Sequence, residues 1–133
     1  ESLANVTVEV EADYEIEIAT DDAISAALVV NELVTNAAKY AYPRGPGVVH
    51  VTVAREGESG FSIAVRDEGG GLPEGFDMKK GKGLGMRIVN AFTRQLKGSC
   101  EIHRRDSGTE FVVTVPNARR NAFMAPPALA EAI

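Results

Sequence analysis

Four side chains in one short stretch have the spacing of a shared helix face: Glu32, Asn36, Lys39 and Tyr40. Residues three or four apart on an α-helix lie side by side. On such a face a carboxylate can hold a water or a proton, and an amide oxygen can bind Mg²⁺. An ammonium can meet a phosphate, and an aromatic ring can cover a ribose or a base. The face therefore indicates nucleotide chemistry, although an ordinary solvated helix face can have the same composition.

A glycine-rich loop follows the strand-like segment that ends at Asp67. Seven glycines lie between positions 69 and 85, and glycine lets a backbone approach a ligand closely. A carboxylate accepts hydrogen bonds only, so Asp67 can bind the amino group of adenine and would reject the keto group of guanine. The end of the loop leads into a helix whose first amides can face phosphates, with Lys82 and its neighbouring lysines nearby. Taken alone, a plain turn or linker also explains either part of the loop.

Other nucleotide motifs are missing from the chain. No G-x-x-x-x-G-K-[ST] segment occurs, and neither glycine cluster satisfies G-x-G-x-x-G. The sequence also lacks the His-Arg-Asp and Asp-Phe-Gly signatures of eukaryotic-type protein kinases. P-loop, Rossmann and eukaryotic kinase mechanisms are therefore excluded.

Composition limits the class of protein further. The 133 residues are 44% hydrophobic, which fits one compact domain. The single cysteine, Cys100, cannot form an internal disulfide, so a reducing, cytoplasmic compartment is expected. The net charge is -5 and the basic residues are scattered, which disfavours nucleic acid as a partner. No apolar stretch approaches the roughly 18 residues that span a bilayer, so no membrane contact is expected from this chain, although a longer parent protein could be anchored.

Alternating apolar residues predict six short strands, of which the first two would form a hairpin or strand pair. The expected strands are Val6–Val10, Tyr14–Ile18, Val49–Val53, Phe61–Val65, Cys100–Ile102 and Phe111–Val115. Helical spacing predicts one helix that Thr20 caps and that runs to Ala41, with Asp21 and Asp22 in its first turn. A second helix is expected from Leu84 to Leu96, ending at Gly98.

These elements predict an α+β fold: a two-layer sandwich in which a mixed, mostly antiparallel sheet is covered on one face by helices. Residues 1–116 would form the domain. Residues 117–133 would be a C-terminal tail of unknown role. The strand-like sequence at Glu1, without an initiator methionine, indicates a piece of a longer protein.

The order of four segments resembles that of the catalytic domains of bacterial sensor histidine kinases. Asn31–Tyr40 is similar to their N box, Asp67–Gly71 and Gly83–Met86 to their two glycine boxes, and Gly108–Phe111 to their closing Gly-Thr strand. The resemblance implies the Bergerat fold shared with DNA gyrase, Hsp90 and MutL. It places the chain close to the HWE-related group, although the chain has no Trp and therefore lacks the Trp-x-Glu signature of strict members.

The resemblance implies a set of site residues. Asn36 would coordinate Mg²⁺. The residues expected to contact the nucleotide are Asn36, Lys39, Tyr40, Asp67, Gly69, Gly71, Lys82, Gly83, Leu84, Gly85, Met86 and Thr109. Segment 74–82 would be the ATP lid, and Thr109 would support the adenine through Asp67 or a water.

Glu32 is the candidate catalytic residue. In the ATPase relatives a glutamate at this place activates water. A kinase must instead exclude water and can take the proton with an acid beside the acceptor histidine, so the role of Glu32 as base stays open.

The resemblance further implies an enzyme: the catalytic domain of a two-component sensor histidine kinase that uses ATP and Mg²⁺. Phosphoryl transfer requires mainly alignment and charge neutralisation. The two histidines, His50 and His103, alternate with apolar neighbours as exposed strand residues do, so neither is expected to be the acceptor. The expected partners are a histidine-bearing dimerisation domain of the same protein and a response regulator.

Three other functions remain alternatives. A stand-alone serine kinase of the anti-sigma-factor type shares the fold, and sequence upstream of Glu1 would separate it from a histidine kinase. A degenerate nucleotide-binding scaffold module is disfavoured by the presence of Asn36, Asp67 and both glycine loops. A gyrase-like ATPase is disfavoured by the short lid.

Overall fold

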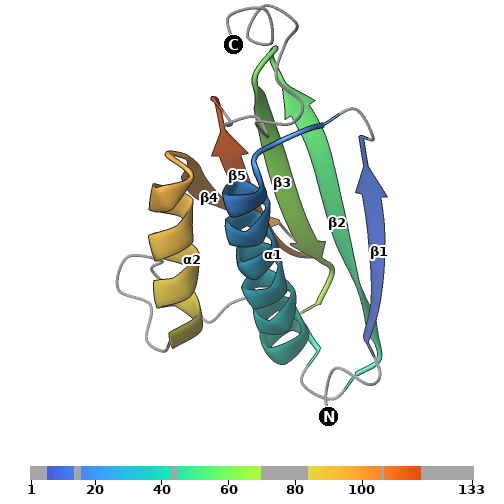
Figure 1. The fold of residues 1–133 in the computed structure, drawn as a ribbon. Helices are drawn as coiled ribbons and strands as arrows, with labels where there is room; N and C mark the ends of the chain where they lie inside the picture. Colours follow the sequence, from blue (N-terminus) through green and yellow to red (C-terminus); the bar gives the residue numbers. More distant parts are fainter. Residues whose placement is uncertain (1–5, 14–15, 43–44, 70–83, 106, 118–133) are drawn as a thin grey trace, which may run out of the picture.

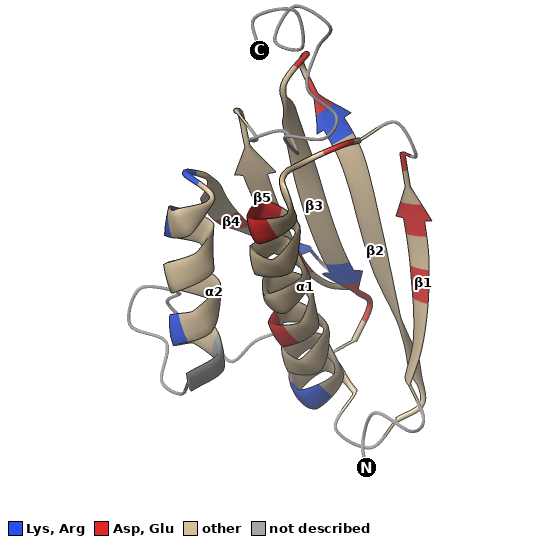
Figure 2. Cartoon of the chain, viewed as in Figure 1, with Lys and Arg blue, Asp and Glu red and all other residues tan. Residues whose placement is uncertain are grey.

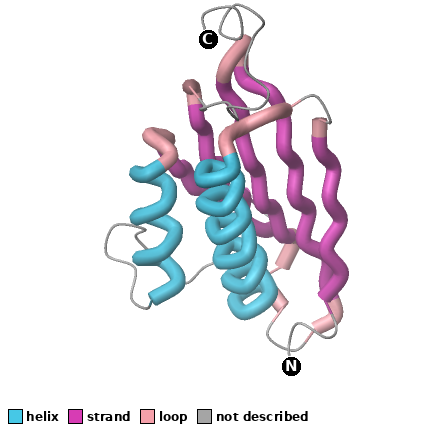
Figure 3. Tube along the Cα trace, viewed as in Figure 1, coloured by secondary structure: helices cyan, strands magenta, loops and turns pink. Residues whose placement is uncertain are grey.

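The computed structural model describes residues 6–13, 16–42, 45–69, 84–105 and 107–117. Within these ranges the elements are β1 (Val6–Ala12), α1 (Thr20–Ala41), β2 (Gly47–Glu56), β3 (Gly60–Asp67), α2 (Leu84–Gln95), β4 (Ser99–Arg105) and β5 (Gly108–Val115). The strands form one sheet in the order β1-β2-β3-β5-β4. Both helices lie on the same side of this sheet (Figure 1, Figure 3). The predicted two-layer α+β fold is confirmed.

The sheet is mixed because its first strand is parallel to its neighbour. β1 pairs with β2 in parallel, and the other three pairings are antiparallel. Parallel neighbours need a long crossover connection, which α1 supplies. The prediction that the first two expected strands form a hairpin or strand pair is therefore wrong. Ile16 and Ile18 are in no strand and pack, half-buried, against the core within the connection to α1, while Tyr14 lies outside the described residues.

The core fills the space between the helices and the three central strands. Alternate residues of β2, β3 and β5 point to the helices: Val49, Val51, Phe61, Ile63, Val65, Phe111, Val113 and Val115. Val29 and Leu33 of α1, together with Met86 and Val89 of α2, pack in the same cluster. Each of these side chains contributes about 1.5–3 kcal/mol when it is fully buried, so this layer fixes the position of both helices.

The sheet edge at β1 is poorly covered, because α1 contacts β2 and β3. Val8 is 43% exposed and Val10 is 67% exposed, although alternating apolar residues are typical of a strand with one buried face. On the outer side of α1, Ile24 and Leu28 are also exposed. The apolar spacing predicted the helix correctly, but Val29 and Leu33 are the residues that face the sheet.

The start of α1 differs from the prediction by one residue. Ala19 is the N-cap, without a side-chain cap, and its carbonyl accepts a hydrogen bond from the Ala23 N–H at 2.9 Å. Thr20 is therefore the first helical residue and not the cap. Asp21 and Asp22 lie in the first turn as expected, and Lys39 lies in the last. Acidic residues at the start and a basic residue at the end complement the helix dipole (Figure 2).

The end of α2 is a Schellman motif. The Gly98 N–H donates to the Thr93 carbonyl at 3.0 Å, and the Lys97 N–H donates to the Arg94 carbonyl at 2.9 Å. The left-handed residue is Lys97, with φ 57°, and not Gly98. Gly98 is still required, because a Cβ there would lie 3.1 Å from Val115 Cγ2 and closer to the Thr114 carbonyl oxygen.

Candidate functional site

Several predicted site residues gather at one end of the sheet. β3 ends at Asp67, β5 begins at Gly108, and the C-terminal half of α1 and the start of α2 lie beside them, in the lower part of Figure 1. The approach is close, since a Cβ on Gly69 would lie 2.7 Å from Ala41 Cβ at the end of α1. Residues that are far apart in the sequence are thus brought to one place.

Asp67 is the buried carboxylate of this site. It is only 5% exposed. Its Oδ1 accepts hydrogen bonds from the Gly69 N–H at 3.2 Å and from the Thr109 N–H at 3.3 Å. Burial raises the pKa of Asp67, and the two N–H donors oppose that effect without cancelling it. Among the described residues Oδ1 takes both bonds and Oδ2 takes none, which leaves Oδ2 for a ligand.

Two glycines allow the backbone around Asp67 to pack so closely. Gly108 has φ 118°, a conformation that favours glycine. A Cβ on Gly108 would lie 2.7 Å from the Asp67 carbonyl carbon and 2.8 Å from Glu68 Cα. Together with the contact between Gly69 and Ala41, this leaves no room for larger residues on either side of the carboxylate.

The predicted face of α1 is present and borders the same end of the sheet. Glu32, Asn36 and Tyr40 are half-buried, and Lys39 is exposed. The Lys39 Nζ lies 5.5 Å from the centroid of the Tyr40 ring, within the range of a cation–π contact. Glu32 makes no hydrogen bond or ion pair with any residue that the structure describes.

Asn36 contacts the second helix directly. Its Nδ2 donates to the Met86 Sδ at 3.3 Å, and Met86 is 3% exposed. A thioether sulfur can only accept a hydrogen bond, which settles the orientation of the amide. The nitrogen faces Met86, so Oδ1 faces away from it. The contact thereby leaves the amide oxygen of Asn36 free to act as a metal ligand.

The remaining predicted residues lie at the start of α2 or before it in the sequence. Leu84 and Gly85 are the first two residues of α2. Gly71, Lys82, Gly83 and the expected lid at 74–82 lie outside the described residues.

Tyr42 was not predicted as a site residue, yet it contacts the site. It follows α1 directly, and its hydroxyl accepts a hydrogen bond from the Glu68 N–H at 2.8 Å. The available signal was its position, one residue beyond a helix that carries other site residues.

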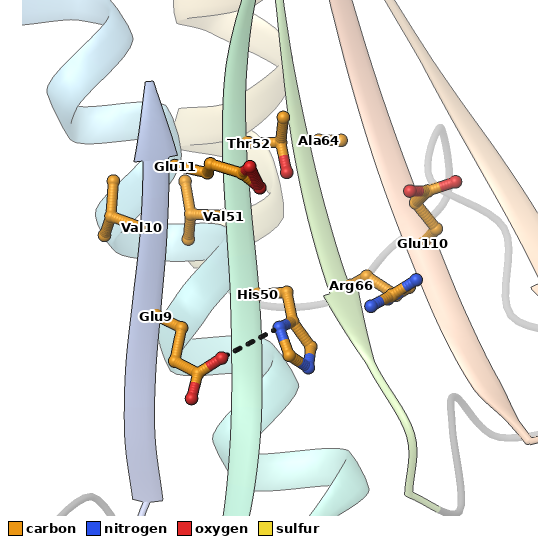
Figure 4. Close-up of a pocket in the computed structure, with 9 residues that line it drawn as sticks. All are labelled: Glu9, Val10, Glu11, His50, Val51, Thr52, Ala64, Arg66 and Glu110. Atoms are coloured by element: carbon orange, nitrogen blue, oxygen red, sulfur yellow. Dashed lines mark ion pairs between the residues drawn. The ribbon is translucent and has the colours of Figure 1, made fainter. Parts of the chain in front are cut away.

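A second surface feature lies on the face of the sheet that the two described helices leave uncovered. Figure 4 shows a pocket lined partly by Glu9, His50, Arg66 and Glu110. The volume of this pocket is about 450 Å³. His50 Nδ1 lies 3.4 Å from Glu9 Oε1, and the His50 side chain is 29% exposed. His50 is therefore half-buried instead of fully exposed, whereas His103 on β4 is exposed as predicted. This pocket shares no residue with the site around Asp67.

Comparison with known proteins identifies the family. Residues 21–119 match the family described as "Histidine kinase-, DNA gyrase B-, and HSP90-like ATPase". The sensor histidine kinase PdtaS of Mycobacterium tuberculosis is 34% identical over 108 residues, which cover 79% of this chain and 22% of PdtaS. The structure of the blue-light activated histidine kinase EL346 of Erythrobacter litoralis has a TM-score of 0.76 and 29% identity, covering 84% of this chain and 35% of that one.

A third protein with a similar fold was solved with a nucleotide analogue. Full-length ShkA in complex with AMPPNP has a TM-score of 0.67 and 21% identity, covering 88% of this chain and 27% of ShkA. At that identity the likeness shows the fold alone.

The chain therefore belongs to the family of histidine kinase-, DNA gyrase B- and HSP90-like ATPases. The resemblance predicted from its motifs is confirmed, and the expected place near the HWE-related group is consistent with the likeness to EL346. The chain spans only 22% of the length of PdtaS, so it corresponds to one part of such a protein. No helix in the described part of the chain is long and apolar enough to cross a membrane.

Proposed function

We propose that this chain is the ATP-binding catalytic domain of a sensor histidine kinase and transfers the γ-phosphate of ATP to a histidine of another domain. The observation that carries this proposal is the Asp67 carboxylate, buried with one oxygen held by two N–H groups. The sensor kinase names of PdtaS and EL346 support the type of reaction. The AMPPNP bound to ShkA supports an adenine nucleotide as the ligand.

Asp67 would select the base. The amino group of adenine donates a hydrogen bond and fits Oδ2, whereas the keto oxygen of guanine would face a carboxylate that can only accept. The Thr109 N–H donates to the other carboxylate oxygen, Oδ1, and so holds the carboxylate in place. In this proposal Thr109 therefore acts on adenine through Asp67, and Gly69 and Gly71 shape the floor of the pocket.

Asn36 would be the metal ligand, because its contact with Met86 directs Oδ1 away from the sulfur. An amide oxygen suits Mg²⁺, which usually takes few protein ligands and completes its shell with water and phosphate oxygens. The ion would supply charge neutralisation at the phosphates. Lys39 and Tyr40, which follow on the same helix face, would contact the phosphate and nucleoside side.

The start of α2 would face the phosphates. The first N–H groups of a helix are unpaired and carry a partial positive charge, which favours phosphate oxygens. The proposed donors are the amides of Gly83, Leu84, Gly85 and Met86, with Lys82 and the lid at 74–82 beside them.

The acceptor histidine would lie on a dimerisation domain of the same protein, and a response regulator would receive the phosphate from it. Glu32 is the proposed catalytic residue of this chain. It would orient the incoming group or take its proton. The proposed compartment is the cytoplasm, with residues 1–116 as the catalytic domain and 117–133 as a tail.

Calorimetry with a non-hydrolysable ATP analogue and Mg²⁺ tests the binding part of the proposal, with GTP as the control. The parent should bind the adenine analogue and not GTP. Asp67→Asn should weaken adenine binding by about ten- to a hundredfold, since a hydrogen bond to a charged group contributes about 1.5–3 kcal/mol. Asn36→Ala should lose the metal dependence. A folded parent that binds no nucleotide would indicate a degenerate scaffold module.

A phosphotransfer assay tests the reaction part. The chain is mixed with the histidine-bearing domain of its own protein, and the labelled product is treated with acid. A phosphohistidine loses its label because its P–N bond is acid-labile, whereas an acid-stable label would indicate a serine kinase. Glu32→Gln should slow the transfer in single-turnover kinetics without changing nucleotide affinity, if Glu32 takes the proton.

A further inference from the structure

The hydroxyl of Tyr42 connects two backbone segments at the edge of the site. It accepts a hydrogen bond from the Glu68 N–H at 2.8 Å and donates one to the Val48 carbonyl at 2.8 Å. A phenol has one hydrogen to donate, so both bonds are made in consistent roles. Glu68 immediately follows Asp67, and Val48 belongs to β2. The hydroxyl therefore links the residue after the buried carboxylate to the neighbouring strand.

The register of the sheet shows what the hydroxyl replaces. β2 and β3 pair up to Val49 opposite Asp67, and one further step would place Val48 opposite Glu68. In a continued antiparallel ladder these backbones could bond directly. Here the Tyr42 hydroxyl stands between the Glu68 N–H and the Val48 carbonyl. It holds the strands apart at the point where the loop leaves the sheet.

The Tyr42 ring is itself held in place. A Cβ on Gly47 would lie 2.5 Å from Tyr42 Cδ2, so the ring packs directly on the Gly47 backbone. The Tyr42 N–H also donates to the Ala38 carbonyl at 3.2 Å, which continues the bonding of α1. Tyr42, and with it the hydroxyl, is therefore held in a fixed position relative to α1, the helix that carries Asn36.

We propose that Tyr42 is a positioning residue for base recognition. It fixes Glu68 and Gly69, the two residues after Asp67, relative to α1, so that the carboxylate on β3 and the Asn36 amide on α1 keep a set spacing. The inference rests on the proposed function, because it assigns Tyr42 to the adenine side of that site. Without the hydroxyl, Glu68 and Gly69 would lose a contact that holds them before the nucleotide binds. Part of the binding free energy would then be spent on ordering them, which lowers the affinity for the nucleotide.

Tyr42→Phe tests this inference, because it keeps the ring and removes only the hydroxyl. In calorimetry with Mg²⁺ the variant should bind the non-hydrolysable ATP analogue about tenfold more weakly than the parent, the range expected for lost hydrogen bonds. Binding of inorganic tripolyphosphate should not change, so the ratio between the two ligands falls. A role in global folding would weaken both ligands equally. Thr52→Val is the matched control, since it removes an exposed hydroxyl from β2 on the uncovered face.

Amide hydrogen exchange of the nucleotide-free chain is the second measurement. Tyr42→Phe should exchange about tenfold faster at Glu68 and Gly69, while Ile63 and Val65 in the middle of β3 stay protected. Unchanged exchange at the loop, or an unchanged affinity ratio, overturns the positioning role while the proposed function stands. A parent that binds no adenine nucleotide overturns both.

Discussion

Alanine at Gly108 should reduce both stability and nucleotide affinity. The φ of 118° strains any L side chain, by about 1–3 kcal/mol. The new Cβ would lie 2.7 Å from the Asp67 carbonyl carbon, whereas carbon atoms in contact prefer about 3.5 Å or more. The Asp67 carbonyl oxygen would lie closer still, so the ends of β3 and β5 must separate by at least about 0.8 Å. The bond between the Thr109 N–H and Asp67 Oδ1, already 3.3 Å long, would break.

The expected result is a melting temperature lower by about 5–10 °C and an affinity for the ATP analogue at least about tenfold weaker. Gly57→Ala is the control, because Gly57 also has a positive φ, 64°, but its Cβ would meet no atom within 4 Å. That variant should lose about 1–2 kcal/mol and keep its affinity. Thermal unfolding and calorimetry on the same samples separate the two effects. Gly108→Ala with the affinity of the parent would refute the reasoning.

Three further outcomes are expected. Met86→Leu removes the acceptor that orients Asn36 but conserves volume, so it should lower the free energy of unfolding by less than about 1.5 kcal/mol. It should also weaken the Mg²⁺ dependence of nucleotide binding severalfold. An unchanged Mg²⁺ titration would contradict this prediction. Because the pKa of Asp67 is raised above 3.8, the folded state binds its proton more tightly. In urea unfolding the parent should therefore lose stability relative to Asp67→Asn as pH rises from 3.8 through the folded pKa. A parent that gains stability relative to the variant over this range would contradict the prediction. Leu33→Ala, at a fully buried position, should lower the free energy of unfolding by about 2–5 kcal/mol, measured by the same method, while the folded fraction keeps its affinity.

The parts of the fold that depend on neighbouring residues could be predicted from the sequence. The alternation before and after the turn at Gly57 predicted the strands β2 and β3, and helical spacing predicted both helices. The prediction of a strand at Ile16 and Ile18 was wrong. Alternation in a sequence shows which side chains would share a face, but it does not show which segment a strand pairs with. The actual partner of β1 comes after α1 in the sequence. Local alternation contains no information about that pairing.

The site was predictable in its residue types but not in its contacts. Spacing placed Asn36 on one helix face with its neighbours, and the structure keeps that face. No spacing rule could show that Met86, fifty residues later, accepts the Asn36 amide. Tyr42 was missed for the same reason: its hydroxyl acts between β2 and the loop after β3, which only the assembled sheet brings together.

The environment of Asp67 argues that it serves a ligand and not the fold. A buried carboxylate that only stabilises structure is usually paired with a cation, because desolvation disfavours its charge. Among the described residues Asp67 has only two backbone N–H partners, both on Oδ1, and burial still raises its pKa. A buried ionisable group that lowers the stability of the nucleotide-free domain is typical of a functional site, where activity requires the group despite its cost. Replacing Asp67 with asparagine should therefore leave the domain at least as stable near neutral pH, while adenine binding weakens about ten- to a hundredfold.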